Sequence, residues 1–238
     1  MKSLSNVFPI YQRELRSYFN SPIAYVVIVV FLAIVGWFFT NNLFLANIAS
    51  LRLVFELVPL VFLFFVPAIT MRLLAEEKKS GTLELLATKP VSDVEIVLAK
   101  FLAAWTLLAA ALLPTLLYLI TLVAIGEIDV GPVVTGYVGL LLMGGVYIAV
   151  GVLASGLTEN QIIAFIVGFL FVFALFMIDK VLLYVPEAFS STLEFLGVDY
   201  HFSNIARGVI DSRNVVYFFS VIGFSLLLAT VSLERRKW

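Results

Sequence analysis

Residues 71–100 read MRLLAEEKKSGTLELLATKPVSDVEIVLAK, and long apolar runs flank them on both sides. Ten charged side chains fall in this stretch, out of 15 basic and 16 acidic residues in the whole chain. One Lys, Arg or Asp at the centre of a bilayer costs about 2.5–3.5 kcal/mol on the insertion scale. The stretch therefore lies in water, and the apolar runs on either side anchor both its ends in a membrane.

The stretch is punctuated as helix, break and short helix. Lys78 and Lys79 suit the last turn of a helix, where cations meet the negative end of the helix dipole. Gly81 suits the left-handed position just beyond that turn. Pro90 disfavours helical geometry at the residue before it, so a short helix is predicted over about Thr82–Thr88.

A second break follows, and a new helix is predicted from Ser92, because Ser92-Asp93-Val94-Glu95 is a capping box. On the short helix before it, Leu83 and Leu86 share one face at i, i+3 spacing. An apolar face in water is expected to need a partner. The alternative is an ordinary solvated loop between two spans, since charged cytoplasmic loops are common.

The stretch resembles the hallmark of ABC-2 type transporter permeases in residues 72–86 (RLLAEEKKSGTLELL), in KPVS at 89–92, and in Lys100 after Glu95. It is most similar to the gliding-motility and copper-accessory branch of single-domain permeases. In that family the segment is a coupling helix that docks into a cleft on a separate ATP-binding subunit. The resemblance implies these docking residues: Glu76, Glu77, Ser80, Gly81, Thr82, Leu83, Glu84 and Leu86.

The composition is that of an integral membrane protein. Of the 238 residues, 62% are hydrophobic and 13% charged, whereas soluble domains have about 45–50% and about 25%. A net charge of −1 gives no reason to expect nucleic acid as a partner. The chain has no cysteine, so disulfides and thiolate metal sites are excluded. Its single histidine, His201, is expected to be a polar residue of an extramembrane segment.

Six apolar runs are long enough to cross a bilayer, so the predicted fold is all-α, with one transmembrane domain over residues 1–238. The spans are predicted at 22–40, 53–74, 94–125, 133–157, 162–185 and 215–233. Residues 1–21 are predicted to form an amphipathic interfacial helix, which would be the elbow helix of the family; the alternative is a flexible polar leader. The resemblance implies that residues 75–92 are the cytoplasmic coupling segment, and short extracytoplasmic helices are expected within 186–214.

Local signals refine these spans. Ser21 is the expected N-cap of the first span, with Pro22 at its first position, and Pro114 should bend the third. The fourth span is rich in glycine, which allows close helix packing, so it should lie centrally in the bundle. Thr158-Glu159-Asn160-Gln161 is interpreted as a second capping box.

The distribution of basic residues predicts the orientation. With six spans, eleven basic residues fall on the face that carries both termini and the 71–100 stretch, and four fall on the other. The positive-inside rule therefore predicts that both termini and this stretch are cytoplasmic, in a prokaryotic inner membrane.

The sequence contains no G-x-x-x-x-G-K-[ST] motif, so an ATPase that drives this chain must be another polypeptide. We therefore expect no catalytic, cofactor or metal site here, with ATP and Mg²⁺ bound by the partner. The resemblance implies an exporter permease that pairs with a second copy or a sister permease. An extracytoplasmic accessory protein would be a further partner. Phe165, Phe169 and Phe176 are the candidate translocation path, with lipid-facing packing as the alternative.

Two other functions stay open. One is a non-transporting scaffold that anchors an ATPase in an envelope machine. The other is a secondary transporter or channel that works without ATP. Such proteins usually carry ionisable residues in mid-span, and the third, fourth and sixth spans have none at their centres. Glu56, near the outer end of the second span, is either a substrate or ion contact or an interfacial residue.

Overall fold

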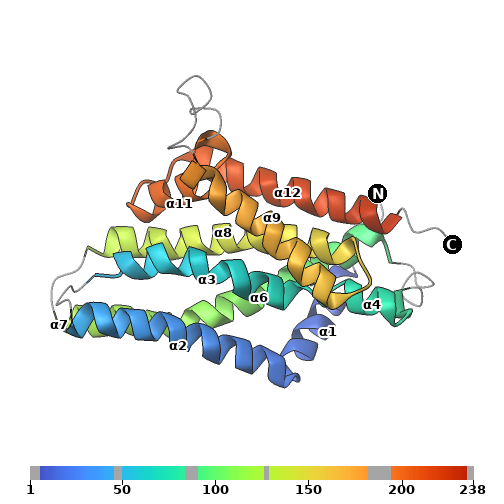
Figure 1. Cartoon of the computed structure of the whole chain (residues 1–238), viewed down its shortest axis with the longest axis horizontal. Helices are drawn as coiled ribbons and strands as arrows, with labels where there is room; N and C mark the ends of the chain where they lie inside the picture. The colour runs from blue at the N-terminus through green and yellow to red at the C-terminus, as the bar shows by residue number, and fades with distance from the viewer. Residues whose placement is uncertain (1–5, 46–49, 84–90, 126–128, 182–193, 235–238) are drawn as a thin grey trace.

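The computed structural model (Figure 1) describes residues 6–45, 50–83, 91–125, 129–181 and 194–234, and within these ranges it is helical with no strand. Six helical stretches are long and apolar enough to cross a membrane, as predicted: Pro22–Phe44, Arg52–Lys79, Asp93–Ile125, Val130–Gly156, Gln161–Val181 and Ser212–Glu234. The chain is a multi-pass membrane protein. The predicted residues 182–185 and 186–193 lie outside the described residues.

The described helices follow one another along the chain. They are α1 (Val7–Phe19), α2 (Pro22–Phe44), α3 (Arg52–Thr70), α4 (Ala75–Lys79), α6 (Asp93–Leu112), the 3₁₀ turn η1 (Leu113–Thr115), α7 (Leu116–Ile125), α8 (Val130–Gly156), α9 (Gln161–Val181), α11 (Val198–Ala206) and α12 (Ser212–Glu234). Pro114 lies in η1, so the predicted bend of the third span is a 3₁₀ break between α6 and α7.

Helix α8 is the centre of the bundle, as its glycines predicted. It contacts α3, α6, α9, α11 and α12, and most of its side chains are buried. A Cβ on Gly136 would lie 2.5 Å from the Phe55 ring of α3, and one on Gly144 would lie 2.7 Å from Leu108 of α6. Glycine at these positions is what lets the neighbouring helices approach so closely.

The predicted second span, 53–74, is not one continuous helix. α3 contains Pro59 and Pro67 and ends at Thr70, and residues 71–74 form turns before α4 begins at Ala75. The sequence carried no signal for this break, because residues 71–74 are Met, Arg, Leu and Leu, which all favour helices. The neighbouring helix α8 supplies hydrogen-bond partners to the backbone at this break.

Two of the three predicted helix starts are confirmed. The Ser21 hydroxyl accepts a hydrogen bond from Ile23 N, with Pro22 at the first position. The Ser92–Glu95 capping box is present in both directions. The third was wrong: the cap of α9 is Asn160, whose Oδ1 accepts from Ile162 N at 2.9 Å. Asn160 directly precedes the first residue of α9, Gln161, whereas Thr158 lies two residues before Asn160.

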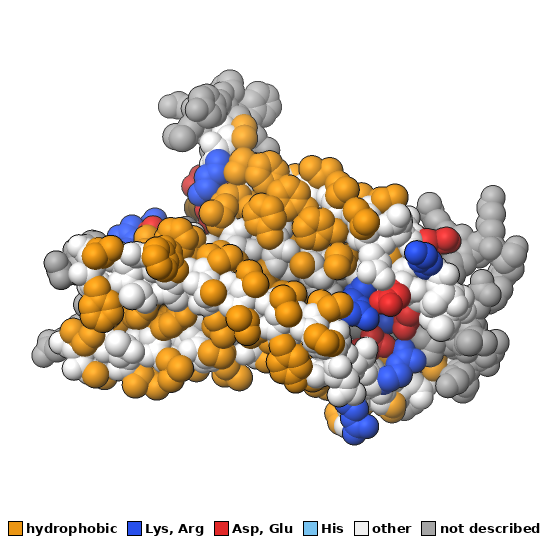
Figure 2. Space-filling model, turned by 60° about the horizontal axis from the view of Figure 1, so that its bottom comes forward, with side chains coloured by type: hydrophobic (Ala, Val, Ile, Leu, Met, Phe, Trp, Pro, Cys, Tyr) orange, Lys and Arg blue, Asp and Glu red, His pale blue; other side chains and the backbone are white. Residues whose placement is uncertain are grey.

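Helix α1 forms at the start of the chain, as predicted, and packs against α6. Ile10 and Tyr18 are buried and Glu14 lies between them, whereas Phe8 is 63% exposed. Figure 2 shows how side chains of different types are distributed on one face of the molecule. Hydrophobic side chains cover its middle, and charged ones gather toward its ends.

His201 is a core residue of the described structure, which the sequence did not predict. It lies on α11 and is fully buried. Its ring stacks on Tyr217 with centroids 3.9 Å apart, and its nitrogens lie 2.7 Å from Asn214 Oδ1 and 2.9 Å from the Phe195 carbonyl. These contacts fix α11 to α12, at the end of the bundle opposite α4 (Figure 1).

Candidate functional site

The candidate site is built on the helix break at residues 71–74. Ser155, on α8, is fully buried beside this break. Its hydroxyl accepts hydrogen bonds from Leu74 N at 3.0 Å and Ala75 N at 3.1 Å, and it donates one to the Met71 carbonyl at 3.0 Å. The break leaves these three backbone groups without helical partners. The Ser155 hydroxyl satisfies all three, because it can donate one hydrogen bond and accept two.

The end of α8 also holds α4 directly. The Gly156 carbonyl accepts hydrogen bonds from Lys78 Nζ and, at 3.1 Å, from Ser232 Oγ of α12. Just before the break, Gly151 lies against the Thr70 side chain so closely that a Cβ there would overlap it. The end of α3, α4, α8 and α12 are therefore joined at one place.

Four charged side chains join α4 to α1 and α6, and we refer to them as the ion-pair cluster: Arg13, Glu14, Glu77 and Lys100. Lys100 is 1% exposed, and its Nζ lies 2.9 Å from Glu77 Oε1 and 3.3 Å from Glu14 Oε2. Arg13 Nη2 lies 2.6 Å from Glu14 Oε1 and 3.1 Å from Glu77 Oε1. Two cations and two carboxylates offset one another, as burial of an ammonium group requires.

The ion-pair cluster shifts the pKa values of its two members on α1, Arg13 and Glu14. Burial would raise the pKa of Glu14, but the Lys100 ammonium and the Arg13 guanidinium outweigh burial and lower that pKa below its ordinary value. Burial would lower the pKa of Arg13, but Glu14 and Glu77 raise it. Tyr18, one turn further along α1, donates a hydrogen bond to the Ile69 carbonyl at 3.0 Å. Its pKa is raised by burial and by the Glu14 carboxylate.

The predicted break at Gly81 is confirmed. Gly81 has φ of 68°, the left-handed conformation expected just after a helix, and its N–H donates to the Lys78 carbonyl at 3.2 Å. A new helical turn starts at Thr82 and Leu83. Glu84 and Leu86, together with the rest of the predicted short helix to residue 88, lie outside the described residues.

The predicted docking residues divide into two groups. Leu83, which we expected to need an outside partner, is 2% exposed and packs in the chain's own core. Glu77 is engaged in the ion-pair cluster, with 17% of its side chain exposed. Ser80 and Thr82 are exposed, and 45% of the Glu76 side chain is exposed, although it pairs with Arg72 at 3.0 Å. The surface available to a partner here is therefore polar.

Two hollows flank α4. One, of about 400 Å³, lies between α1, α4 and α6 and is lined in part by the ion-pair cluster, Glu76 and Thr82. The other, of about 480 Å³, lies between Lys78–Lys79 and the turn 157–160, which connects α8 to α9. Sequence reasoning missed this turn as part of the site. It also missed Arg13, Glu14 and Ser155, although Glu14 stands four residues from both Ile10 and Tyr18, on their face of α1.

The three candidate path residues do not share one cavity. Phe176 is buried and lines a cavity at the opposite end of the bundle. Phe169 packs on Phe64 of α3, with ring centroids 5.0 Å apart. Phe165 lies four residues before it and is half-buried. No group of three or more His, Asp or Glu side chains that could hold a metal ion occurs among the residues that the structure describes.

A family model described as "ABC-2 family transporter protein" matches residues 38–198, which is more than half of the chain. The match includes the helix break, α4, Gly81, the capping box, Lys100 and Ser155. A search of curated proteins finds no match.

Proposed function

Because the chain belongs to the ABC-2 transporter family and is a membrane permease subunit without an ATPase domain, we propose that residues 75–92 are its coupling segment. A separate ATP-binding subunit, which binds ATP and Mg²⁺, docks on this segment. The observation that carries the proposal is the way α4 is held. Ser155 ties its first turn to α8, and the ion-pair cluster ties Glu77 to α1 and α6.

This arrangement suits the transmission of a push. A displacement of α4 by the ATPase would reach α8 through Ser155, and α8 contacts most of the bundle. It would reach the start of α6 through Lys100. The ATPase can shift the permease between two states only if it binds one of them more tightly than the other.

The docking surface, in this proposal, is polar and composite. It comprises Glu76, Ser80 and Thr82, with Lys79 and Glu159 on either side of the second hollow. Glu84 and Leu86 belong to the surface by the family resemblance. Leu83 and Glu77 support it from within, because their side chains are engaged inside the chain.

We propose that this end of the bundle is cytoplasmic and that α1 lies at the membrane interface. The positive-inside bias supports this orientation. The start of α1, α4 and the end of α12 lie at one end of the molecule in Figure 1, as an even number of spans requires. The chain would then be an inner-membrane exporter permease, paired with a second copy or a sister permease, in the gliding-motility and copper-accessory branch. Phe165, Phe169 and Phe176 would face its path, and α11 an extracytoplasmic accessory protein.

The docking proposal is tested by substitutions at two exposed residues of the docking surface, one that reverses a charge and one that introduces a large cation. In the double variant Glu76→Lys, Thr82→Arg we expect loss of association with the ATP-binding subunit, measured by co-purification, and an unchanged unfolding temperature. Arg213→Glu, an exposed change at the opposite end, is the matched control and should keep the association. Undiminished association of the double variant would show that the ATPase docks elsewhere.

A further inference from the structure

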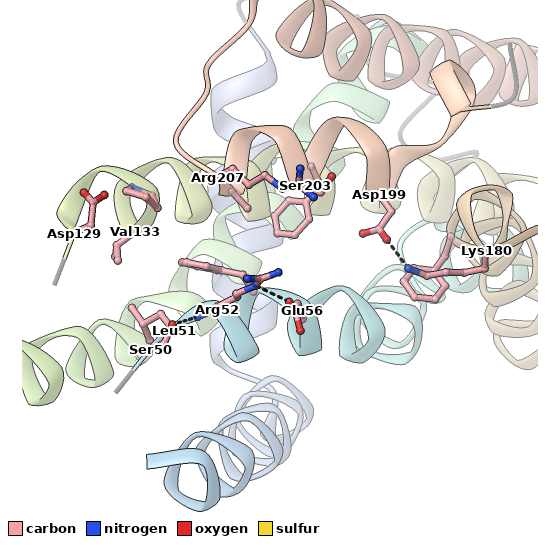
Figure 3. A pocket seen from close by; sticks show the side chains of 15 residues that line it. Ser50, Leu51, Arg52, Glu56, Asp129, Val133, Lys180, Asp199, Ser203 and Arg207 are labelled. Carbon is pink, nitrogen blue, oxygen red and sulfur yellow. Dashed lines mark hydrogen bonds and ion pairs between the residues drawn. The ribbon is translucent and has the colours of Figure 1, made fainter. Parts of the chain in front are cut away.

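A cavity of about 940 Å³ lies at the end of the bundle opposite α4. Figure 3 shows it between the start of α3, the start of α8, the end of α9 and α11. Ligand sites usually have volumes of about 300–1,000 Å³, so this cavity has the size of a site for one small molecule. The coupling mechanism proposed above does not involve this cavity, although Phe176, one of the candidate path residues, lines it.

The floor of the cavity is apolar and aromatic. Phe55 of α3, Phe176 of α9 and Phe202 of α11 line it, each from a different helix, and each is at least 90% buried. Phe202 is held in place because it packs against Gly139 of α8, where a Cβ would lie 3.0 Å from its ring. Such a floor binds hydrocarbon and offers no hydrogen bond to a small hydrophilic ion.

The rim is charged: three cations, Arg52, Lys180 and Arg207, stand with three carboxylates, Glu56, Asp129 and Asp199. The cations differ in how they are engaged. Lys180 is paired with Asp199 at 2.8 Å, which ties α9 to α11. Among the residues that the structure describes, Arg52 forms an ion pair with Glu56 alone, at 3.0 Å and four residues away on α3, and the two side chains are 83% and 61% exposed. An ion pair this exposed contributes little and exchanges readily. Arg207 has no acidic partner among the residues that the structure describes.

We propose that this cavity binds a single amphiphile with an anionic phosphate head group. The phosphate lies between Arg52 and Arg207, and the apolar part lies on Phe55, Phe176 and Phe202. Guanidinium groups suit this role because their planar donors match phosphate oxygens in pairs. The position also fits, since the cavity opens at the end of the spans, where phospholipid head groups meet water.

The test uses the purified full-length chain in a neutral detergent, with dioctanoyl phosphatidylglycerol as the probe and native mass spectrometry as the readout. We expect saturable binding of one molecule to the parent. The double variant Arg52→Ala, Arg207→Ala should bind at least about tenfold more weakly, because two charge-assisted hydrogen-bonding groups are lost. Arg213→Ala removes the same charge at the same end, outside the cavity lining, and should bind as the parent does.

Two further probes separate the sources of affinity. Inorganic phosphate at millimolar concentration should not displace the amphiphile, because it gains nothing from the aromatic floor. Dioctanoylglycerol, which has the same chains and no phosphate, should bind at least about tenfold more weakly than the phosphatidylglycerol. The proposal is overturned if the double variant binds like the parent, if Arg213→Ala weakens binding equally, or if either comparison probe binds as well as the amphiphile.

Discussion

The Lys100 ammonium lies 2.9 Å from the Glu77 carboxylate, with the lysine side chain 1% exposed. Glu77 lies near the start of the charged stretch 71–100, and Lys100 is its last residue. Their contact therefore joins the beginning of this stretch to its end. Arg13 and Glu14 of α1 complete the ion-pair cluster, so α1 belongs to the same unit.

Removal of the Lys100 charge should strongly destabilise the chain. In Lys100→Met, Glu14 and Glu77 keep only Arg13 as a cationic partner, and their side chains are 13% and 17% exposed. We expect a loss of about 3 kcal/mol in the free energy of unfolding, measured by denaturant unfolding in detergent. Lys79→Met, an exposed lysine of the same segment, is the control and should change little. Equal stability of the two variants would contradict a structural role for the cluster.

Acid should weaken the cluster through Glu14. Its pKa is lowered in the folded state from an ordinary value of 4.5. A lowered pKa gives stability that is fully present above about pH 4.5 and is lost as pH falls through the folded-state value. The difference in unfolding temperature between the parent and Glu14→Gln should therefore be constant from pH 7 to about pH 5 and shrink below pH 4.5. A difference that stays constant down to pH 3 would show that Glu14 is not the titrating group.

Features of the site that depend on neighbours in sequence could be predicted. The Ser92–Glu95 capping box and the left-handed Gly81 each rest on a few adjacent residues, and both are present. The six spans follow from length and hydropathy alone. What decides these features is local geometry and solvation, which the sequence displays directly.

Features that depend on distant partners could not be predicted. The hydroxyl of Ser155 meets the N–H of Leu74, 81 positions earlier, and Lys100 meets Glu14, 86 positions earlier. Nothing near Ser155 in the sequence distinguishes it from a small residue at a helix contact. Leu83 was misread for the same reason, since the core that covers it comes from other segments.

Ser155→Ala should be costly for so small a change. It leaves two backbone N–H groups and one carbonyl without partners in a buried place. An unsatisfied buried group costs about 1–3 kcal/mol, so we expect a loss of about 3 kcal/mol in unfolding free energy. Ser232→Ala removes one hydrogen bond to the Gly156 carbonyl, which keeps Lys78 as a donor, and should cost about 1 kcal/mol. Equal effects would argue against Ser155 as the residue that holds the break.

Gly81→Ala separates backbone strain from packing. A Cβ at this position would meet nothing within 4 Å, but φ is 68°. An L-residue in this left-handed conformation costs about 1–2 kcal/mol, so we expect a loss of about 1 kcal/mol in unfolding free energy. Gly223→Ala is the matched control, because its Cβ would also meet nothing within 4 Å and its φ is ordinary. It should be neutral or slightly stabilising, since alanine favours helices more than glycine does. Gly81→Asn, which tolerates this conformation better, should recover part of the loss. If Gly81→Ala matches Gly223→Ala in denaturant unfolding, the turn after α4 does not require its left-handed conformation.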